Sequence, residues 1–177
     1  MRRLGPNLRA VEEGAFMVSF RMAAFAAAMM AALSAHAREP FSKPDLMRWG
    51  ATQTELETAL QGKCGKSINA RSIVPPFLEN IQTRQMQIDC DGFMFFGKPR
   101  WVEFVIGDDS LEMVWIMTAK EEEVALLAAM TEAYGAPTMS SANYVAFTNN
   151  GAALRLDKPE VLFYAPDVAA GVEEEFK

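Results

Sequence analysis

The chain has 177 residues and an acidic balance, with 17 lysines and arginines against 23 aspartates and glutamates and a formal net charge of −6. Such a chain, without a run of basic residues, argues against a nucleic-acid or anionic-membrane partner, and solubility alone is a sufficient reason for the charge. Its single histidine narrows the catalytic mechanisms that are available.

Residues 1–37 have the pattern of a secretory signal. Arg21 precedes an apolar run over residues 22–33, and Ala35 and Ala37 supply the small residues that signal peptidase requires. The run is shorter than the roughly 20 apolar residues that span a bilayer, so we predict cleavage after Ala37 and no membrane span after processing. We therefore expect a periplasmic or secreted protein of residues 38–177, the size of one domain.

Cleavage after Ala37 removes His36, the only histidine of the chain. Without histidine, the exported protein cannot use a Ser-His-Asp or Cys-His mechanism, and it lacks the commonest transition-metal ligand. The segment Asp89-Cys90-Asp91-Gly92 is similar to the start of a calcium loop, but the later acidic ligands are missing at the required spacing. We expect no cofactor and no metal site.

Two cysteines remain after processing, Cys64 and Cys90. In an exported protein an isolated pair of this kind favours a disulfide, which would stabilise the fold by about 3 to 4 kcal/mol on the chain-entropy model. A redox-active pair is the alternative, although the spacing is not the CxxC of redox motifs.

Two helices are predicted from their capping patterns. Thr52 and Glu55 fit a capping box, in which each side chain satisfies a free backbone N–H, and an apolar stripe follows up to Gly62. The same pattern recurs at Thr118 and Glu121 and leads into a second apolar stripe.

Residues 84–117 predict three antiparallel strands in a row. The turn formers at residues 107–110 set Ile106 opposite Leu111 across a tight hairpin. Counting outward then gives one wholly apolar face and one mixed face. The apolar face also pairs Phe104 with Met113 and Val102 with Trp115, whereas the mixed face pairs Val105 with Glu112, Glu103 with Val114 and Trp101 with Ile116.

Three further strands are predicted at residues 144–148, 152–156 and 161–165, with Phe147 opposite Leu154 in the first hairpin. The expected fold is therefore α+β, of order helix-βββ-helix-βββ, with an antiparallel sheet and its helices on one face. The tail that follows residue 166 ends in an acidic run and is expected to be a solvated end.

A tryptophan lies three residues before each predicted cap, Trp49 before Thr52 and Trp115 before Thr118. This repeat indicates a tandem duplication into halves of about residues 46–117 and 118–166, with chance agreement as the alternative.

The element order over residues 46–165, with Trp49-Gly50-Ala51-Thr52 and Tyr134-Gly135-Ala136-Pro137 flanking the helices, resembles two groups of small exported proteins. These are the SmpA/OmlA lipoproteins of outer-membrane assembly and the β-lactamase inhibitor proteins, which duplicate a helix-plus-sheet unit. A general likeness to exported proteins of proteobacteria implies no activity. Because the chain lacks the lipoproteins' acylated cysteine and has one short helix per sheet unit, no membrane-assembly role or inhibitory target is carried over.

The mixed face of the sheet is the predicted functional surface. An aromatic anchor among charged residues suits a non-catalytic binding, inhibitor or adaptor module with a protein partner in the cell envelope. Alternatively, the proline-containing connection at residues 65–81 or a second subunit covers this face. The predicted binding residues are Trp101, Glu103, Val105, Glu112, Val114, Ile116, Arg155 and Tyr164.

A carboxylate-based hydrolase of envelope polysaccharide is the alternative function. It would assemble its acid and base from Glu103, Glu112 and Asp89 in a deep acidic cleft. The absence of nucleophile, base and phosphate-loop motifs favours the binding module.

Overall fold

The computed structural model describes residues 40–65 and 68–177. The predicted signal segment and its cleavage position after Ala37 lie outside these residues. Among the helices of the described part, none is both long enough and apolar enough to cross a membrane.

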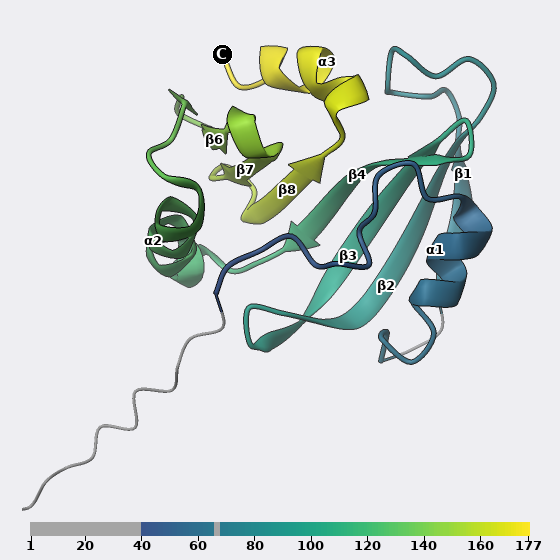
Figure 1. Cartoon of the computed structure of the whole chain (residues 1–177), viewed down its shortest axis with the longest axis horizontal. Helices are drawn as coiled ribbons and strands as arrows, with labels where there is room; N and C mark the ends of the chain where they lie inside the picture. The colour runs from purple at the N-terminus through teal and green to yellow at the C-terminus, as the bar shows by residue number, and fades with distance from the viewer. Residues whose placement is uncertain (1–39, 66–67) are drawn as a thin grey trace, which may run out of the picture. The chain divides into compact units, whose positions relative to one another are not determined.

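Eight antiparallel strands form one sheet in the order β1-β2-β3-β4-β8-β7-β6-β5 (Figure 1). Two of the helices precede four strands each, and a third helix ends the chain. The strands are β1 (Asn69–Ile73), β2 (Gln85–Phe95), β3 (Lys98–Gly107), β4 (Ser110–Met117), β5 (Met139–Ser140), β6 (Tyr144–Phe147), β7 (Ala152–Arg155) and β8 (Glu160–Tyr164). The helices are α1 (Gln53–Ala59), α2 (Glu123–Tyr134) and α3 (Ala169–Glu174), with 3-10 turns η1 (Lys120–Glu122), η2 (Thr148–Asn150) and η3 (Pro166–Val168).

The α+β class and the antiparallel sheet are confirmed. Each expected set of three strands is present, and each has one further short strand in front of it. β1 forms within the connection that was expected to be irregular, and it lies at the sheet edge with Asn69 opposite Asp89. β5 lies at the other edge, so both additional strands extend the sheet outward.

One face of the sheet packs against α1 and α2. The segment before α1, dark blue in Figure 1, crosses this face and adds Phe41 and Met47 to the core. Phe41 lies 5.5 Å from Phe95, 5.7 Å from Tyr134 and 6.1 Å from Phe163, measured between ring centroids. The strand residues of this core are Ile88, Cys90, Phe93, Phe95, Val102, Phe104, Ile106, Leu111, Val114, Ile116, Phe147, Ala152, Leu154, Val161 and Phe163.

The opposite face of the sheet carries a second, smaller core that holds α3. Val168 of η3, Val172 of α3 and Phe176, which follows α3, recur every four residues and pack together against the sheet. Tyr164 packs beneath them with a ring-centroid distance of 6.0 Å to Phe176, and its hydroxyl donates to Glu173 at 2.9 Å. The prediction of a solvated tail is therefore wrong, as is the placement of every helix on one face.

A β-bulge changes the predicted register of the β3–β4 hairpin. Ile106 does lie opposite Leu111, but Val105 is opposite Met113, so Glu112 is an extra residue in β4. The register beyond it moves by one residue, and the remaining predicted pairs are wrong. Val114 now faces Phe104, which exchanges the faces of every residue from Met113 onward.

The β6–β7 hairpin also differs from its predicted register, with a different consequence. Phe147 pairs with Ala152 instead of Leu154, because η2 takes up residues 148–150. Since this shift is two residues, Phe147 and Leu154 stay on the face that was predicted, and both belong to the larger core.

The first capping box is confirmed and the second is wrong by one residue. The Glu55 backbone N–H donates to the Thr52 hydroxyl at 3.2 Å, and Thr52 N–H donates to the Glu55 carboxylate at 2.9 Å. Before α2 it is Glu122 that accepts from the backbone, at 3.1 Å from Ala119 N. The same Glu122 carboxylate also accepts two hydrogen bonds from Arg100 of β3, at 2.5 and 2.9 Å.

The predicted disulfide between Cys64 and Cys90 is confirmed, and it joins the end of the α1 segment to β2. The backbones approach closely beside it, where Gly65 N–H donates to Asp91 at 2.6 Å. A Cβ at Gly92 would lie 2.9 Å from Gly65 N, and Gly92 has a φ of +84°, so this contact requires glycine.

Candidate binding groove

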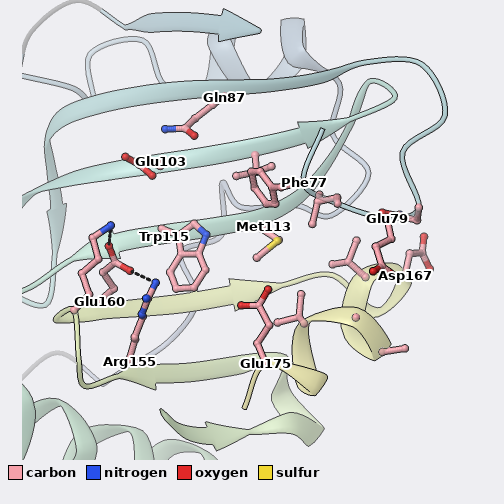
Figure 2. Close-up of a pocket in the computed structure, with 18 residues that line it drawn as sticks. Phe77, Glu79, Gln87, Glu103, Met113, Trp115, Arg155, Glu160, Asp167 and Glu175 are labelled. Atoms are coloured by element: carbon pink, nitrogen blue, oxygen red, sulfur yellow. Dashed lines mark ion pairs between the residues drawn. The ribbon is translucent and has the colours of Figure 1, made fainter. Parts of the chain in front are cut away.

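A groove of about 600 Å³ lies on the sheet face that carries α3 (Figure 2). Its floor is formed by residues of the sheet, one wall is the connection between β1 and β2, and the other wall is η3 with α3. Figure 2 shows Trp115 and Met113 on the floor, with Phe77 and Glu79 entering from the connection. The volume falls within the usual range of ligand pockets.

The groove residues form a floor and two walls. The floor consists of Gln87, Glu103, Val105, Met113, Trp115, Arg155, Lys158 and Glu160, the first wall of Phe77, Leu78, Glu79 and Asn80, and the second wall of Asp167, Val168, Ala170, Gly171, Val172 and Glu175.

Gln85 and Asp108 hold the first wall in place. The buried Gln85 side-chain oxygen accepts from the backbone N–H groups of Phe77 at 3.0 Å and Leu78 at 3.1 Å. The Asp108 carboxylate accepts from the Thr83 hydroxyl at 2.6 Å and from three successive backbone N–H groups at 2.7, 2.8 and 2.9 Å. These bonds hold the pKa of Asp108 well below its ordinary value, the Thr83 hydroxyl contributing most.

Close packing fixes the same wall from below. The Ile81 side chain lies directly over Gly107 of β3, and a Cβ added at Gly107 would collide with it. The connection can therefore approach the sheet because β3 ends in a residue without a side chain.

Arg155 occupies one end of the groove. Its guanidinium lies 5.9 Å from the Trp115 ring centroid and 5.7 Å from that of Tyr144, within the range of cation–π contact. It binds Asp157 at 2.8 Å and approaches Glu160 at 3.6 Å, while Lys158 binds Glu160 at 3.0 Å. Both cations of the groove are thus neutralised by carboxylates of their own hairpin.

The other carboxylates of the groove have no such partner. Glu79, Asp167 and Glu175 are exposed, and Glu103 is half-buried. Within residues 40–65 and 68–177 none of these four forms an ion pair. These four residues, called the acidic rim below, therefore give the groove a net negative charge around the apolar side chains of Val105, Met113 and Trp115.

The structure brings three of the eight predicted binding residues, Glu103, Val105 and Arg155, into this groove. Trp101 is 43% exposed but lies outside the groove lining. Tyr164 is buried against Phe176, beneath α3. The bulge places Val114 and Ile116 in the larger core at 0% exposure, which corrects their predicted position on the outer face.

The remaining predicted residue, Glu112, is the bulge itself and is 5% exposed. Burial raises the pKa of its carboxyl, the nearby carboxylates of Asp167 and Asp108 act in the same direction, and a hydrogen bond from Ser110 opposes them. One of its oxygens has no hydrogen-bond partner. Glu112 is not among the residues that line the groove.

The sequence prediction missed the aromatic and sulfur groups of the groove floor. Trp115 and Met113 were assigned to the core face because the bulge was not recognised, and Phe77 lies in the connection at residues 65–81, which was considered as a cover for the mixed face. Phe77 is 53% exposed. The available signal for the bulge was Glu112, a charged residue close to the turn of an otherwise apolar strand.

Comparison of the chain with family models, with curated proteins and with solved structures finds no match. In the described part of the chain, no group of three or more histidine, cysteine, aspartate or glutamate side chains is arranged to hold a metal ion.

Proposed function

We propose that the protein is an exported, non-catalytic module that binds a segment of a protein partner in the groove, as an inhibitor or adaptor of the cell envelope. The observation that carries this proposal is the half-buried Trp115, which lies with Val105 and Met113 between two walls and is surrounded by charged groups. An aromatic residue in such a position provides contact area, while the surrounding charges select the partner.

The alternative of a carboxylate hydrolase has weaker support. Glu112, whose pKa is raised, lies outside the groove lining. Asp89 is opposite Glu103 across β2 and β3, but it is buried and accepts from Gln87 at 2.7 Å, with Arg71 at 3.4 Å. Neither Asp89 nor Glu112, the two carboxylates predicted to act with Glu103, therefore lines the groove.

Export and duplication are parts of the same proposal. The disulfide fits an oxidising compartment, which is the reason to place the protein in the periplasm or outside the cell. Supporting a duplication, strands β1 to β4 and β5 to β8 mirror one another in the sheet and meet at the β4–β8 pair. This arrangement is also what the likeness to the β-lactamase inhibitor proteins, with their duplicated helix-plus-sheet unit, leads one to expect.

A photocrosslinker tests the proposed binding. A benzophenone amino acid in place of Phe77, at the groove wall, should form a covalent adduct with an envelope protein on irradiation. The matched control places the same group at Val124, which is 84% exposed on α2, a helix of the opposite sheet face. Adduct formation at Phe77 should fall when Trp115→Ala is added. Equal adducts at both positions, or none at Phe77, would contradict the proposal.

A further inference from the structure

The distribution of charge in the groove indicates which kind of segment binds there, an inference that rests on the binding function proposed above. We propose that the groove takes an extended, positively charged segment of the partner, in which an apolar side chain lies on Trp115 and neighbouring lysines or arginines meet the acidic rim.

The charges of the groove identify the sign of its occupant. Five carboxylates line it, from Glu79, Glu103, Glu160, Asp167 and Glu175, against two cations. The two cations, Arg155 and Lys158, already have carboxylate partners within 3.6 Å, and Glu160 is a partner of both. Four carboxylates therefore remain for a ligand, and a positively charged segment is the one that they favour over neutral or negative ones.

The floor determines that the occupant also has an apolar part. Val105 and Met113 are 1% and 4% exposed, and Leu78, Val168 and Val172 close the sides. Trp115 lies directly opposite Glu103 across β3 and β4, so an aromatic ring and a carboxylate that accepts only from the Trp101 indole N–H, at 3.4 Å, are adjacent on the floor. Phe77 and Glu79 repeat this combination on the first wall.

The protein's own Arg155 shows that this combination suits a cation. Its guanidinium packs against Trp115 and Tyr144 while Asp157 and Glu160 bind its nitrogens. The rest of the groove offers the same two kinds of group to a ligand, without an internal cation to fill them.

The size of the groove fits a peptide segment, and its charge disfavours a second copy of this chain. About 600 Å³ accommodates a few side chains, which fits an extended segment. A second copy of this chain would carry the same net charge of −6 and would be repelled by the rim. A small polyamine has the right charge, and the experiment separates it from a peptide.

The test uses three fluorescein-labelled six-residue peptides and the processed protein. One peptide alternates lysine with leucine, and the other two have glutamine or glutamate in place of lysine. Fluorescence anisotropy at low salt should show the lysine peptide binding at least about tenfold more tightly than the glutamine peptide, with no binding of the glutamate peptide. This preference should disappear at high salt, because the rim charges are exposed.

Charge-reversed variants locate the effect. Glu103→Lys with Glu175→Lys should weaken the lysine peptide at least about tenfold and allow the glutamate peptide to bind. The control, Glu121→Lys with Glu132→Lys, makes the same change in net charge at exposed positions beside and on α2 and should leave both peptides unchanged. An equal effect of the two double variants would overturn the inference, as would equal binding of the lysine and glutamine peptides or a failure of all three to bind.

Two further outcomes are distinguishable. If spermine displaces the lysine peptide more effectively than the unlabelled peptide does, the occupant is a small polycation and the inference fails. If the Phe77 crosslink persists unchanged in the Glu103→Lys, Glu175→Lys variant, the groove binds a partner whose charge was assigned wrongly. The binding function then stands while this inference falls.

Discussion

At the scale of single residues, two glutamates close to each other in sequence experience opposite environments. Glu112 is buried with an unpaired oxygen, and its pKa is raised. Glu122 lies against Arg100 and Lys98, and these partners, with Arg100 contributing most, lower its pKa from the ordinary 4.5 to about 2. The first carboxyl therefore opposes folding when it ionises, whereas the second supports folding when it ionises.

Removal of the Glu122 carboxylate should be severely destabilising. Arg100 is 7% exposed, so Glu122→Ala leaves a buried guanidinium without its charged partner, at a cost of about 3 to 5 kcal/mol in the free energy of unfolding. Lys98 contacts the same carboxylate at 2.7 Å but is 59% exposed, so Lys98→Ala should cost less than about 1 kcal/mol. Denaturant unfolding at neutral pH measures both variants.

The same pair predicts a pH dependence. Because the folded-state pKa of Glu122 is below its unfolded value, its contribution is complete above pH 4.5 and is lost as the pH falls through about 2. The difference in stability between the wild type and Glu122→Ala should therefore shrink in acid. A difference that stays constant from pH 6 to pH 2 would mean that packing, and not charge, explains the effect.

At the scale of elements, the β3–β4 turn does more than reverse the chain. Asp108 and Asp109 have positive φ angles of 47° and 67°, as a tight hairpin requires, and sequence reasoning could explain both by the turn alone. In the structure, Asp108 binds the backbone of residues 82–84, and Asp109 accepts from Gln53 of α1 at 3.2 Å. The turn thus fastens two neighbouring segments.

Asp108→Gly should release the first wall of the groove while preserving the turn, because glycine accepts a positive φ. Amide exchange at residues 82–84 should become at least about tenfold faster, with a matching increase in proteolysis of the connection between β1 and β2. Asp109→Gly is the matched control, since it makes the same change at the next position and removes from this wall only an exposed ion pair of 3.8 Å with the Arg84 side chain, without a backbone bond to residues 82–84. If both variants exchange alike at residues 82–84, the four Asp108 bonds do not hold the wall.

Sequence predictions that depend on residues close together in the chain were accurate, whereas those that depend on distant residues were not. The Thr52 capping box and the Ile106–Leu111 pair depend on adjacent residues and are confirmed. The β6–β7 register was wrong by two residues, which preserves the faces, but the bulge at Glu112 shifts β4 by one and reverses them. Met113 and Trp115 of the groove floor could not be predicted for this reason, and the groove walls depend on tertiary contacts of Gln85 and Phe176.

At the scale of the whole molecule, the segment before α1 joins the two halves of the sheet. Phe41 contacts Phe95 of β2 in the first half and Phe163 of β8 with Tyr134 of α2 in the second. Four aromatic rings lie within 6.1 Å of its centroid. If processing follows Ala37, Phe41 is the fourth residue of the exported protein.

Phe41→Ala should therefore lower the free energy of unfolding by about 3 to 5 kcal/mol, because it empties a site that is 5% exposed and is enclosed by rings from both halves. Met94→Ala provides the comparison, since Met94 lies beside Phe95 in β2 but is 61% exposed, and its loss should cost less than about 1 kcal/mol. Chemical denaturation of the processed protein measures both. Similar costs for the two variants would show that the segment before α1 lies on the sheet without contributing to its stability, and that the halves are joined by the β4–β8 pair alone.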